Sequence, residues 1–458
     1  MRKKKLLMFD KKQSSLRLRS ELNDLKRTSE SVAKELNCKE SEIKKYLSGK
    51  YNVDSYLNFL IKFCDFYPVN MSTLIIYKKD TKNGIFFFRL ANSMKSSRIF
   101  KRKDKNNKLR PYYEYRDTAK SNLSNFYPEW ISQIRYVEDS NPNNPDVIFN
   151  KGHFLHQLNL FVGPVNYYYE INGKKICKEM KTGDTSYISP YVKHSFTTRD
   201  KTKLTYIVAV TTGSSLKRNQ NELRMYDKNF FKNLINSKKN KFQYFQNTIK
   251  EALNNEISNL SKFKQEIGTK IFKKLKHRNN FDNLSVAEIF KISEVLKIPP
   301  SSFFYNIENE KEVIDKSFDE TKFNYFPSNN NKLYKIYTSA RTKNFTNLKG
   351  FIIEVISNKI KNLNFKFTLN IYLINFGTTI LSIDWEYNSK FYKKLIKPGD
   401  SIFIEPYIKF NLSSASKKGF VFIVTSESSL DLNTEKEISS IRNPARIIND
   451  NQLWFEGK

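Results

Sequence analysis

The chain has 458 residues, a formal net charge of +34 and a hydrophobic content of 39%. This length predicts more than one domain, and the hydrophobic fraction is sufficient for packed cores. The sequence contains no apolar run long enough to cross a bilayer, and the basic N-terminus lacks a signal-peptide apolar segment. We therefore expect a cytoplasmic protein with no membrane partner. Three cysteines, Cys38, Cys64 and Cys177, lack metal-ligand spacing and are expected to be reduced thiols.

Helices are expected from residue 14 to about residue 75. Within them, TSESVAKELNCKESEIKKYLSGK at 28–50 has the order helix, polar turn, helix and glycine that is typical of a helix-turn-helix. The second helix carries Lys44 and Lys45 but no set of Arg, Asn or Gln side chains that would read base edges. Lys and Arg are also spread over the whole chain rather than gathered in one block. Nucleic-acid binding is therefore not expected, and an architectural or oligomerising role is favoured for these helices.

Strands are expected from about residue 76 to Thr212, with the basic stretch 98–110 leading into an aromatic cluster at 112–115. The pair Asn172-Gly173 lies between two alternating segments and predicts a two-residue hairpin turn.

Three of the four histidines fall between residues 150 and 196. Side chains alternate along a strand, so His153 and Gln157 share one face while His156 points the other way. His194 follows a Gly-Asp turn and a proline, on a separate strand. Imidazoles that converge inside a small barrel are typical ligands of a divalent metal. The pattern therefore predicts a metal site at His153 and His194, with Gln157 on the same face as His153.

The remaining two histidines are not expected to bind the metal. His156 is excluded by its strand parity, and His277 is expected on a helix surface. Taken alone, Gln157 would be interpreted as a polar strand residue.

The second half of the chain repeats the first. Helical patterns return from about 216 to 310, and strands return after 320. The segment KPGDSIFIEPYIKFNL at 397–412 repeats KTGDTSYISPYVKHSF at 181–196, so that Asp400 matches Asp184 and Phe410 matches His194. We therefore expect an α+β fold, a tandem duplication of a helical domain and a barrel, in which the second barrel has lost its ligands. The four domains expected are 1–80 (helical), 81–215 (catalytic barrel), 216–315 (helical) and 316–458 (degenerate barrel).

The segment GDTSYISPYVKHSF resembles the second motif of the cupin superfamily. The duplicated helical-plus-barrel pattern, the Asn-x-Gly-His opening at 150–153 and the Gly-Pro at 163–164 resemble one family within it, that of hydroxyethylphosphonate dioxygenase and methylphosphonate synthase. This resemblance implies jelly-roll cupin barrels and a mononuclear non-haem Fe(II) site. It also implies cleavage of the carbon–carbon bond of 2-hydroxyethylphosphonate with O2.

Two reactions of this family differ at the third metal ligand. The dioxygenase has a Glu six residues before its second His, a position occupied here by Ile188, which cannot bind a metal. The synthase has a Gln four residues after its first His, a position occupied here by Gln157. The resemblance thus implies the ligands His153, Gln157 and His194, and the products methylphosphonate and CO2 or bicarbonate. Two alternatives remain: the sister reaction to hydroxymethylphosphonate and formate, and a helix-turn-helix/cupin transcription regulator.

The resemblance also implies residues that contact the substrate or take part in catalysis. They are Asn150 as a substrate contact, Tyr115 as a phosphonate donor with Tyr113 as a neighbour, Arg102 as the phosphonate-binding cation with Arg98 and Arg110 as alternatives, and Lys26 as a catalytic lysine from the helical domain. A homo-oligomer, a dimer or a tetramer, is expected.

Overall fold

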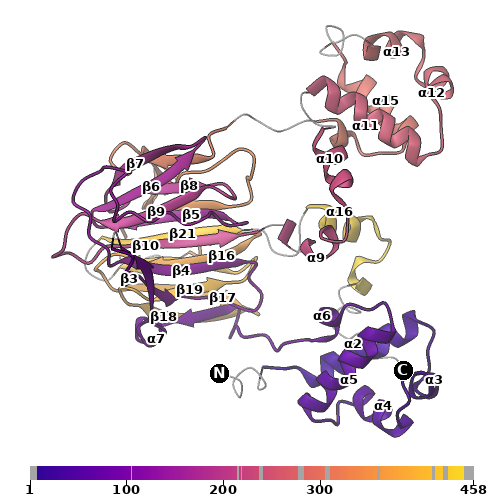
Figure 1. Ribbon diagram of the computed structural model, residues 1–458, viewed down its shortest axis with the longest axis horizontal. Coiled ribbons are helices and arrows are strands. Elements are labelled where there is room, and N and C mark those ends of the chain that lie inside the picture. Colours follow the sequence, from indigo (N-terminus) through magenta and orange to yellow (C-terminus); the bar gives the residue numbers. More distant parts are fainter. Residues whose placement is uncertain are drawn as a thin grey trace. The chain divides into compact units, whose positions relative to one another are not determined.

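The computed structural model describes residues 8–104, 106–213, 216–217, 219–236, 241–276, 283–304, 310–357, 362–414, 418–426 and 432–447. The chain forms two compact units, each described here by itself: Met1–Thr212 with Glu312–Arg341 and Asn347–Lys458, and Gly213–Lys311 with Thr342–Thr346. Helices and antiparallel sheets both occur (Figure 1), so the expected mixed α and β class is confirmed. Among the described residues, no helix is long and apolar enough to cross a membrane.

The first unit begins with a helical bundle. Its helices are α2 (Lys11–Asp24), α3 (Ser29–Glu35), α4 (Glu40–Leu47), α5 (Val53–Phe66) and α6 (Met71–Leu74). Their apolar faces enclose one core, which includes Leu18, Val32, Ile43, Tyr56 and Phe63.

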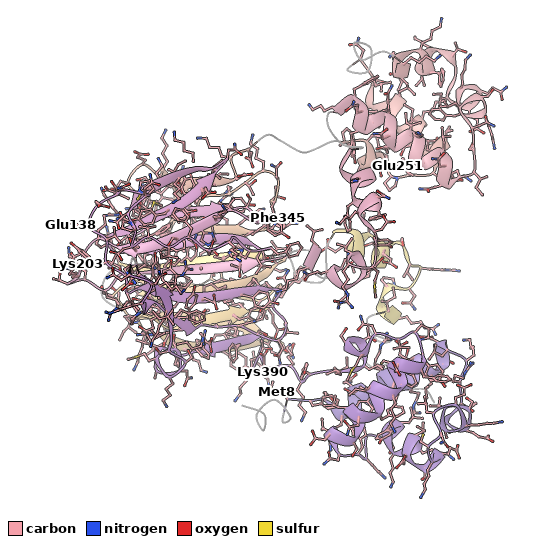
Figure 2. The ribbon with its side chains drawn as sticks, viewed as in Figure 1. Met8, Glu138, Lys203, Glu251, Phe345 and Lys390 are labelled. Atoms are coloured by element: carbon pink, nitrogen blue, oxygen red, sulfur yellow. The ribbon has the colours of Figure 1, made fainter. Side chains whose placement is uncertain are left out.

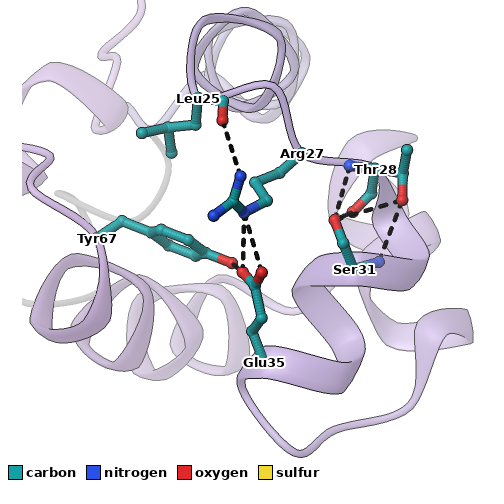
Figure 3. A network of polar contacts seen from close by, with 6 residues as sticks. All are labelled: Leu25, Arg27, Thr28, Ser31, Glu35 and Tyr67. Carbon is teal, nitrogen blue, oxygen red and sulfur yellow. Dashed lines mark hydrogen bonds and ion pairs between the residues drawn. The ribbon is translucent and has the colours of Figure 1, made fainter.

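The helices α3 and α4 are the two expected between residues 28 and 50. Thr28 and Ser31 form a capping box at the start of α3, which satisfies backbone N–H groups that have no partner within the helix. Glu35, at the other end of α3, accepts from both Arg27 and the Tyr67 hydroxyl (Figure 3) and so ties α3 to the end of α5.

A seven-stranded antiparallel sheet follows, in the strand order β11-β8-β5-β10-β4-β3-β2. Its strands are β2 (Arg98–Lys103), β3 (Leu109–Asp117), β4 (Phe126–Gln133), β5 (His156–Val162), β8 (Thr185–Ile188), β10 (Tyr206–Thr212) and β11 (Val313–Lys316). A three-stranded sheet faces it, made of β6 (Val165–Ile171), β7 (Lys174–Met180) and β9 (Lys193–Thr198). A largely aromatic core, with Tyr113, Phe161, Tyr167 and Phe196, fills the space between them. The connections after β4 and after β9 come to the same end of the strands, where Glu138 and Lys203 are labelled in Figure 2.

The same strand order recurs in a second seven-stranded sheet, β1-β19-β16-β21-β14-β13-β12, which faces a four-stranded sheet β15-β20-β17-β18. The strands of the larger sheet are β1 (Ile85–Phe88), β12 (Phe323–Pro327), β13 (Lys332–Thr338), β14 (Lys349–Val355), β16 (Asn370–Asn375), β19 (Ser401–Ile404) and β21 (Gly419–Ser426). The smaller sheet has β15 (Phe365–Lys366), β17 (Leu381–Tyr387), β18 (Lys390–Ile396) and β20 (Lys409–Ser414). The two larger sheets contact each other where the Phe126 ring meets Tyr372 and Phe403.

The two larger sheets exchange their edge strands. Strand β1 precedes the first sheet in the chain but pairs with β19 of the second, and β11 precedes the second sheet but pairs with β8 of the first. Each strand thus pairs outside the residue range in which the sequence had placed it. The helices α7 (Leu90–Lys95) and α16 (Leu432–Ser440) complete the first unit.

The second unit is helical over its described residues. Its elements are α9 (Gln220–Leu223), α10 (Lys228–Asn236), α11 (Lys241–Asn255), α12 (Leu260–Ile267), α13 (Thr269–Lys276), α15 (Val286–Leu296) and the short helix η1 (Pro300–Phe303). Its core includes Phe245, Phe263, Ile292 and Leu296. His277 lies outside the described residues.

Candidate metal centre

The first histidine of the candidate site lies in a loop, not in a strand. Strand β5 begins at His156, so the expected strand parity does not apply to His153. The loop is held by the Tyr191 N–H, which donates to the His153 carbonyl at 2.7 Å, and by Gly152 with a φ of +75°. A side chain at Gly152 would place its Cβ 2.4 Å from the backbone carbonyl oxygen of Tyr191, so only glycine fits. This loop sets His153 Nε2 at 2.9 Å from Oε1 of Gln157.

The second histidine is held in a tautomer suited to metal binding. His194, on β9, has its Nδ1 at 2.9 Å from the Val192 carbonyl, which can only accept, so Nδ1 carries the proton. The lone pair is then on Nε2, which faces the Asn150 amide nitrogen at 2.9 Å. The side-chain oxygen of Asn150, Oδ1, accepts from the backbone N–H groups of His194 and Gly152. Such hydrogen bonds orient metal-binding imidazoles in proteins.

The two rings converge on one another. The ring centroids of His153 and His194 lie 5.2 Å apart at an interplanar angle of 82°. The pKa of His194 is lowered to about 4, chiefly by burial; the Val192 carbonyl opposes this shift, and the charges of His153 and Arg102 contribute to it. The neutral imidazole, which is the form that binds metals, is therefore favoured at neutral pH.

Gln157 presents its amide oxygen to the site because its amide nitrogen is already used. Gln157 Nε2 donates to Oδ1 of Asn159 at 2.7 Å, and Asn159 Nδ2 donates to Oγ of Ser186 at 3.1 Å. All three side chains are buried. Ile188 lies opposite Gln157 in the pairing of β5 with β8. The sequence interpretation missed Asn159 and Ser186, although a second polar residue two positions after Gln157, on the same face of an apolar strand, was a usable signal.

Of the three candidate arginines, Arg102 is the one whose charge reaches the histidine pair, since it lowers the pKa of His194. Its guanidinium lies over the rings of Tyr112 and Tyr113, at 4.9 Å and 5.2 Å from their centroids, and donates to the Ile148 carbonyl. The alternatives form ion pairs elsewhere: Arg98 with Asp117 at 2.8 Å, and Arg110 with Asp104 at 3.5 Å.

The two candidate tyrosines differ in how their hydroxyls are used. The Tyr113 hydroxyl accepts from the Phe196 N–H at 2.8 Å and lies 3.2 Å from Ser195 Oγ. The Tyr115 hydroxyl makes no hydrogen bond to another described residue. Burial, and then the Glu129 charge, raise the pKa of Tyr115 to about 12 while Arg102 opposes them, so the phenol keeps its proton at neutral pH. Tyr115 is therefore the one with a free donor.

The structure places the remaining predicted residues as follows. His156 faces away from the site and has its Nδ1 2.6 Å from the Tyr187 hydroxyl, as its strand parity predicted. Lys26 follows α2 in a left-handed conformation, with a φ of 56°, and is exposed. Within the described part of the chain, no hydrogen bond or ion pair joins Lys26 to the histidine pair.

The donor set passes a test of fit for a divalent metal. Two donor atoms ~2.1 Å from one metal and at right angles lie about 3 Å apart, close to the 2.9 Å between His153 Nε2 and Gln157 Oε1. His153 Nδ1 is buried and has no hydrogen-bond partner among the described residues. Two neutral imidazoles and an amide oxygen are suitable for Fe(II) but do not select it over other divalent ions.

No family model matches the chain. It is, however, 34% identical to the methylphosphonate synthase of Nitrosopumilus maritimus (strain SCM1) over 457 residues, which cover 95% of this chain and 94% of that protein. The chain belongs to the methylphosphonate synthase family. The resemblance stated from the sequence is thus confirmed.

Solved structures related to this family share its fold. The structure of Streptomyces albus HEPD, with 2-hydroxyethylphosphonate and Fe(II) bound, matches with a TM-score of 0.82 and 26% identity, covering 97% of this chain and 99% of that one. A variant of 2-hydroxyethylphosphonate dioxygenase matches with a TM-score of 0.70 and 13% identity, covering 95% and 99%, which is a likeness of fold alone.

Proposed function

We propose that the chain is a non-haem iron oxygenase that cleaves the carbon–carbon bond of 2-hydroxyethylphosphonate with O2, giving methylphosphonate and CO2 or bicarbonate. The observation that carries the proposal is the convergence of His153, Gln157 and His194 in a member of the methylphosphonate synthase family. The S. albus enzyme was solved with Fe(II) and 2-hydroxyethylphosphonate bound, which supports the choice of this metal and this substrate.

The three side chains would hold Fe(II), which supplies the O2-dependent redox chemistry when bound. The protein's own groups bind and orient the substrate. All three ligands are neutral, so the metal would keep its full charge, which a phosphonate dianion offsets. Arg102, already fixed by the Ile148 carbonyl and two rings, supplies a preorganised cation for the phosphonate.

Two further side chains have donors to offer to the substrate. The Tyr115 phenol keeps its proton and donates to a phosphonate oxygen. The Asn150 amide donates to His194 Nε2 at 2.9 Å. A metal on Nε2 would take that lone pair and free the amide N–H for the substrate. Lys26 is proposed to act from the helical bundle, on the resemblance alone.

The choice of product follows from Ile188. This residue lies opposite Gln157 and gives the site no carboxylate, which favours the synthase reaction over the sister reaction to hydroxymethylphosphonate and formate. The transcription regulator is the weaker alternative, since α4 carries no set of Arg, Asn or Gln side chains that would read base edges.

The finer description of the fold belongs to the same proposal. The equal strand orders of the two larger sheets support a tandem duplication of a helical domain and a cupin barrel. We place its parts at 1–80, 81–215, 216–315 and 316–458, apart from the exchanged edge strands, and keep a homo-oligomer and a cytoplasmic location as predictions.

The test is anaerobic loading with Fe(II), followed by O2 and 2-hydroxyethylphosphonate, with the products identified by phosphorus NMR. We expect a methylphosphonate signal that is lost in Gln157→Ala and in His194→Ala. The matched control is His156→Gln, which changes the histidine that faces away from the site and should retain the signal. A hydroxymethylphosphonate signal would overturn the assigned product, and no turnover with loaded iron would overturn the proposal.

A further inference from the structure

The second pair of sheets has a pocket at its side, between the edge strands β1 and β18. Strand β1 ends the seven-stranded sheet and β18 ends the four-stranded one, and residues of both strands line the pocket together with the segment that precedes β1. Its volume is about 570 Å³, within the range of pockets that bind small molecules. None of its lining residues belongs to the candidate metal centre.

Three aromatic side chains line this pocket. The rings of Trp385 and Tyr392 stack with their centroids 5.4 Å apart, and the Phe87 ring lies 6.0 Å from that of Trp385. Trp385 is 4% exposed, and its Nε1–H donates to the Asn83 carbonyl at 3.0 Å, which fixes the indole. Phe87 and Tyr392 are half-buried. The Tyr392 hydroxyl makes no hydrogen bond to another described residue, so this side chain offers both a ring and a free polar group.

Lysines accompany the rings. Lys82, Lys393 and Lys394 all line the pocket, and Lys394 Nζ lies 4.6 Å from the centroid of the Phe87 ring. Lys393 is 3.7 Å from the Asp384 carboxylate. The side chains of Lys82 and Lys394 form no ion pair with any described residue, so their charges are available to a ligand.

The acidic residue of the pocket does not neutralise these lysines. The Asp80 carboxylate already accepts from the Ser121 hydroxyl at 2.6 Å and from the Asn122 N–H at 2.8 Å. The pocket therefore combines aromatic surface with an excess of positive charge, which is complementary to an anionic ligand.

The fold does not require this arrangement, as the first pair of sheets shows. The repeat and the strand pairings give the matching positions there: Asp315 for Phe87, Tyr169 for Trp385 and Ile176 for Tyr392. At these positions the Tyr169 hydroxyl donates to Asp315 at 3.2 Å, a hydrogen bond that links β6 to β11. The larger sheets have the same strand order in both cases. The three rings are thus a local feature of the second pair of sheets.

We propose that this pocket binds a nucleoside phosphate. Aromatic side chains stack on the faces of nucleobases, and lysine ammonium groups bind phosphates as point charges. Tyr392 supplies the stacking surface, and Lys82 and Lys394 supply the charge. The side-chain amide of Asn83 makes no hydrogen bond to another described residue and can bond to a base edge. The proposal does not depend on the proposed function, because it uses no residue of the metal centre.

The experiment is isothermal titration of the full chain with AMP, with adenosine and inorganic phosphate as separate titrants. AMP should bind more tightly than either of its parts. Tyr392→Ile, which introduces the residue found at the matching position on β7, should weaken AMP binding about 10- to 100-fold, the worth of one stacked base. Lys394→Gln should weaken it about 10-fold, the worth of one charged contact. This second variant serves if Tyr392→Ile does not fold.

The matched control is Lys178→Gln, at the position on β7 that corresponds to Lys394, where AMP binding should be unchanged. A saturating concentration of 2-hydroxyethylphosphonate should not displace AMP. Displacement would place AMP at the metal centre and overturn the proposal. Inorganic phosphate that binds as tightly as AMP would exclude a role for the rings and overturn the nucleoside. Absence of AMP binding at millimolar concentration, or equal affinity in Tyr392→Ile and Lys394→Gln, would overturn the pocket itself.

Discussion

His194 and His156 have different surroundings, which assign them different roles. His194 has its Nδ1 proton fixed by a carbonyl and its Nε2 beside the Asn150 amide nitrogen, whereas His156, one position before Gln157, has its Nδ1 beside the Tyr187 hydroxyl on the opposite face. Burial lowers the pKa of both His194 and His156 to about 4. Both rings are therefore neutral at pH 7 in the folded chain.

This shift predicts a metal-free protein that loses stability in weak acid. The unfolded chain takes up these protons near pH 6.5 and the folded chain only near pH 4, so stability is complete above 6.5 and is lost as the pH falls between these values. At pH 5 the loss from His194 alone should be on the order of 2 kcal/mol, and that from the more exposed His156 smaller. Urea unfolding at pH 7.5 and pH 5 measures it. Equal free energies of unfolding at the two pH values would contradict the prediction.

Arg102 offers a second prediction at the scale of one residue. Its planar guanidinium stacks on two rings and donates to a carbonyl at once, which a lysine ammonium does not reproduce. Arg102→Lys should raise KM for 2-hydroxyethylphosphonate about 10- to 100-fold, the worth of one charge-assisted hydrogen bond, with a smaller effect on kcat. The control is Arg98→Lys, at the arginine paired with Asp117, for which steady-state kinetics should be unchanged. An unaltered KM in Arg102→Lys would move the phosphonate site elsewhere.

At the scale of elements, the repeated Gly-Asp turns hold the exchanged strands in place. Asp184 Oδ1 accepts from the Phe318 N–H at 2.9 Å, just after β11, and Asp400 Oδ1 accepts from the Leu90 N–H at 2.9 Å, just after β1. A side chain at the glycine before either aspartate would meet Phe318 or Leu90 closer than 3.0 Å. Each turn therefore fastens the strand that comes from the other half of the chain.

Replacing either aspartate should separate stability from metal binding. Asp184→Ala and Asp400→Ala should each cost about 1–3 kcal/mol of unfolding free energy, since each leaves two partly buried N–H groups without an acceptor. Asp184→Ala alone should also weaken Fe(II) binding, because β8 pairs with β5, the strand that carries Gln157. Chemical unfolding and Fe(II) titration of both variants check this. Equal Fe(II) affinities in the two variants would show that the turn does not support the metal centre.

The elements also show which features a sequence can predict. The hairpin at Asn172-Gly173 was predicted by local chemistry and is confirmed, with β6 ending at Ile171, β7 starting at Lys174 and positive φ at both turn residues. The exchange of β1 and β11 was not predictable, because the run IFFF at 85–88 can pair with either sheet edge, and its choice depends on distant residues. The spacing of His153 and Gln157 was informative although His153 lies in a loop.

At the scale of the whole molecule, the charge of +34 is distributed over both units rather than over one element. In the second unit, α13 ends with Lys273, Lys274 and Lys276, and Lys274 is engaged with Glu288 at 2.8 Å. Such a field attracts phosphonate dianions and nucleic acids alike, and it weakens as salt screens it. The charge by itself therefore does not separate the enzyme from the regulator, but the dependence of DNA binding on sequence does.

Duplex DNA should bind this protein weakly, without regard to sequence and only at low salt. The exposed lysines of α4 provide phosphate contacts, and no set of side chains aimed at base edges accompanies them. The dissociation constant, from fluorescence anisotropy on randomised duplexes, should rise about 10-fold between 50 and 200 mM salt, as expected for the two phosphate contacts of Lys44 and Lys45. Lys45→Glu should lower the slope of log affinity against log salt by about one unit, without changing the preference among sequences. If a selected sequence were bound on the order of 10³-fold more tightly than random DNA at physiological salt, the helical bundle would be a sequence-specific DNA-binding domain. A regulatory function would then have to be considered in addition to the enzymatic one.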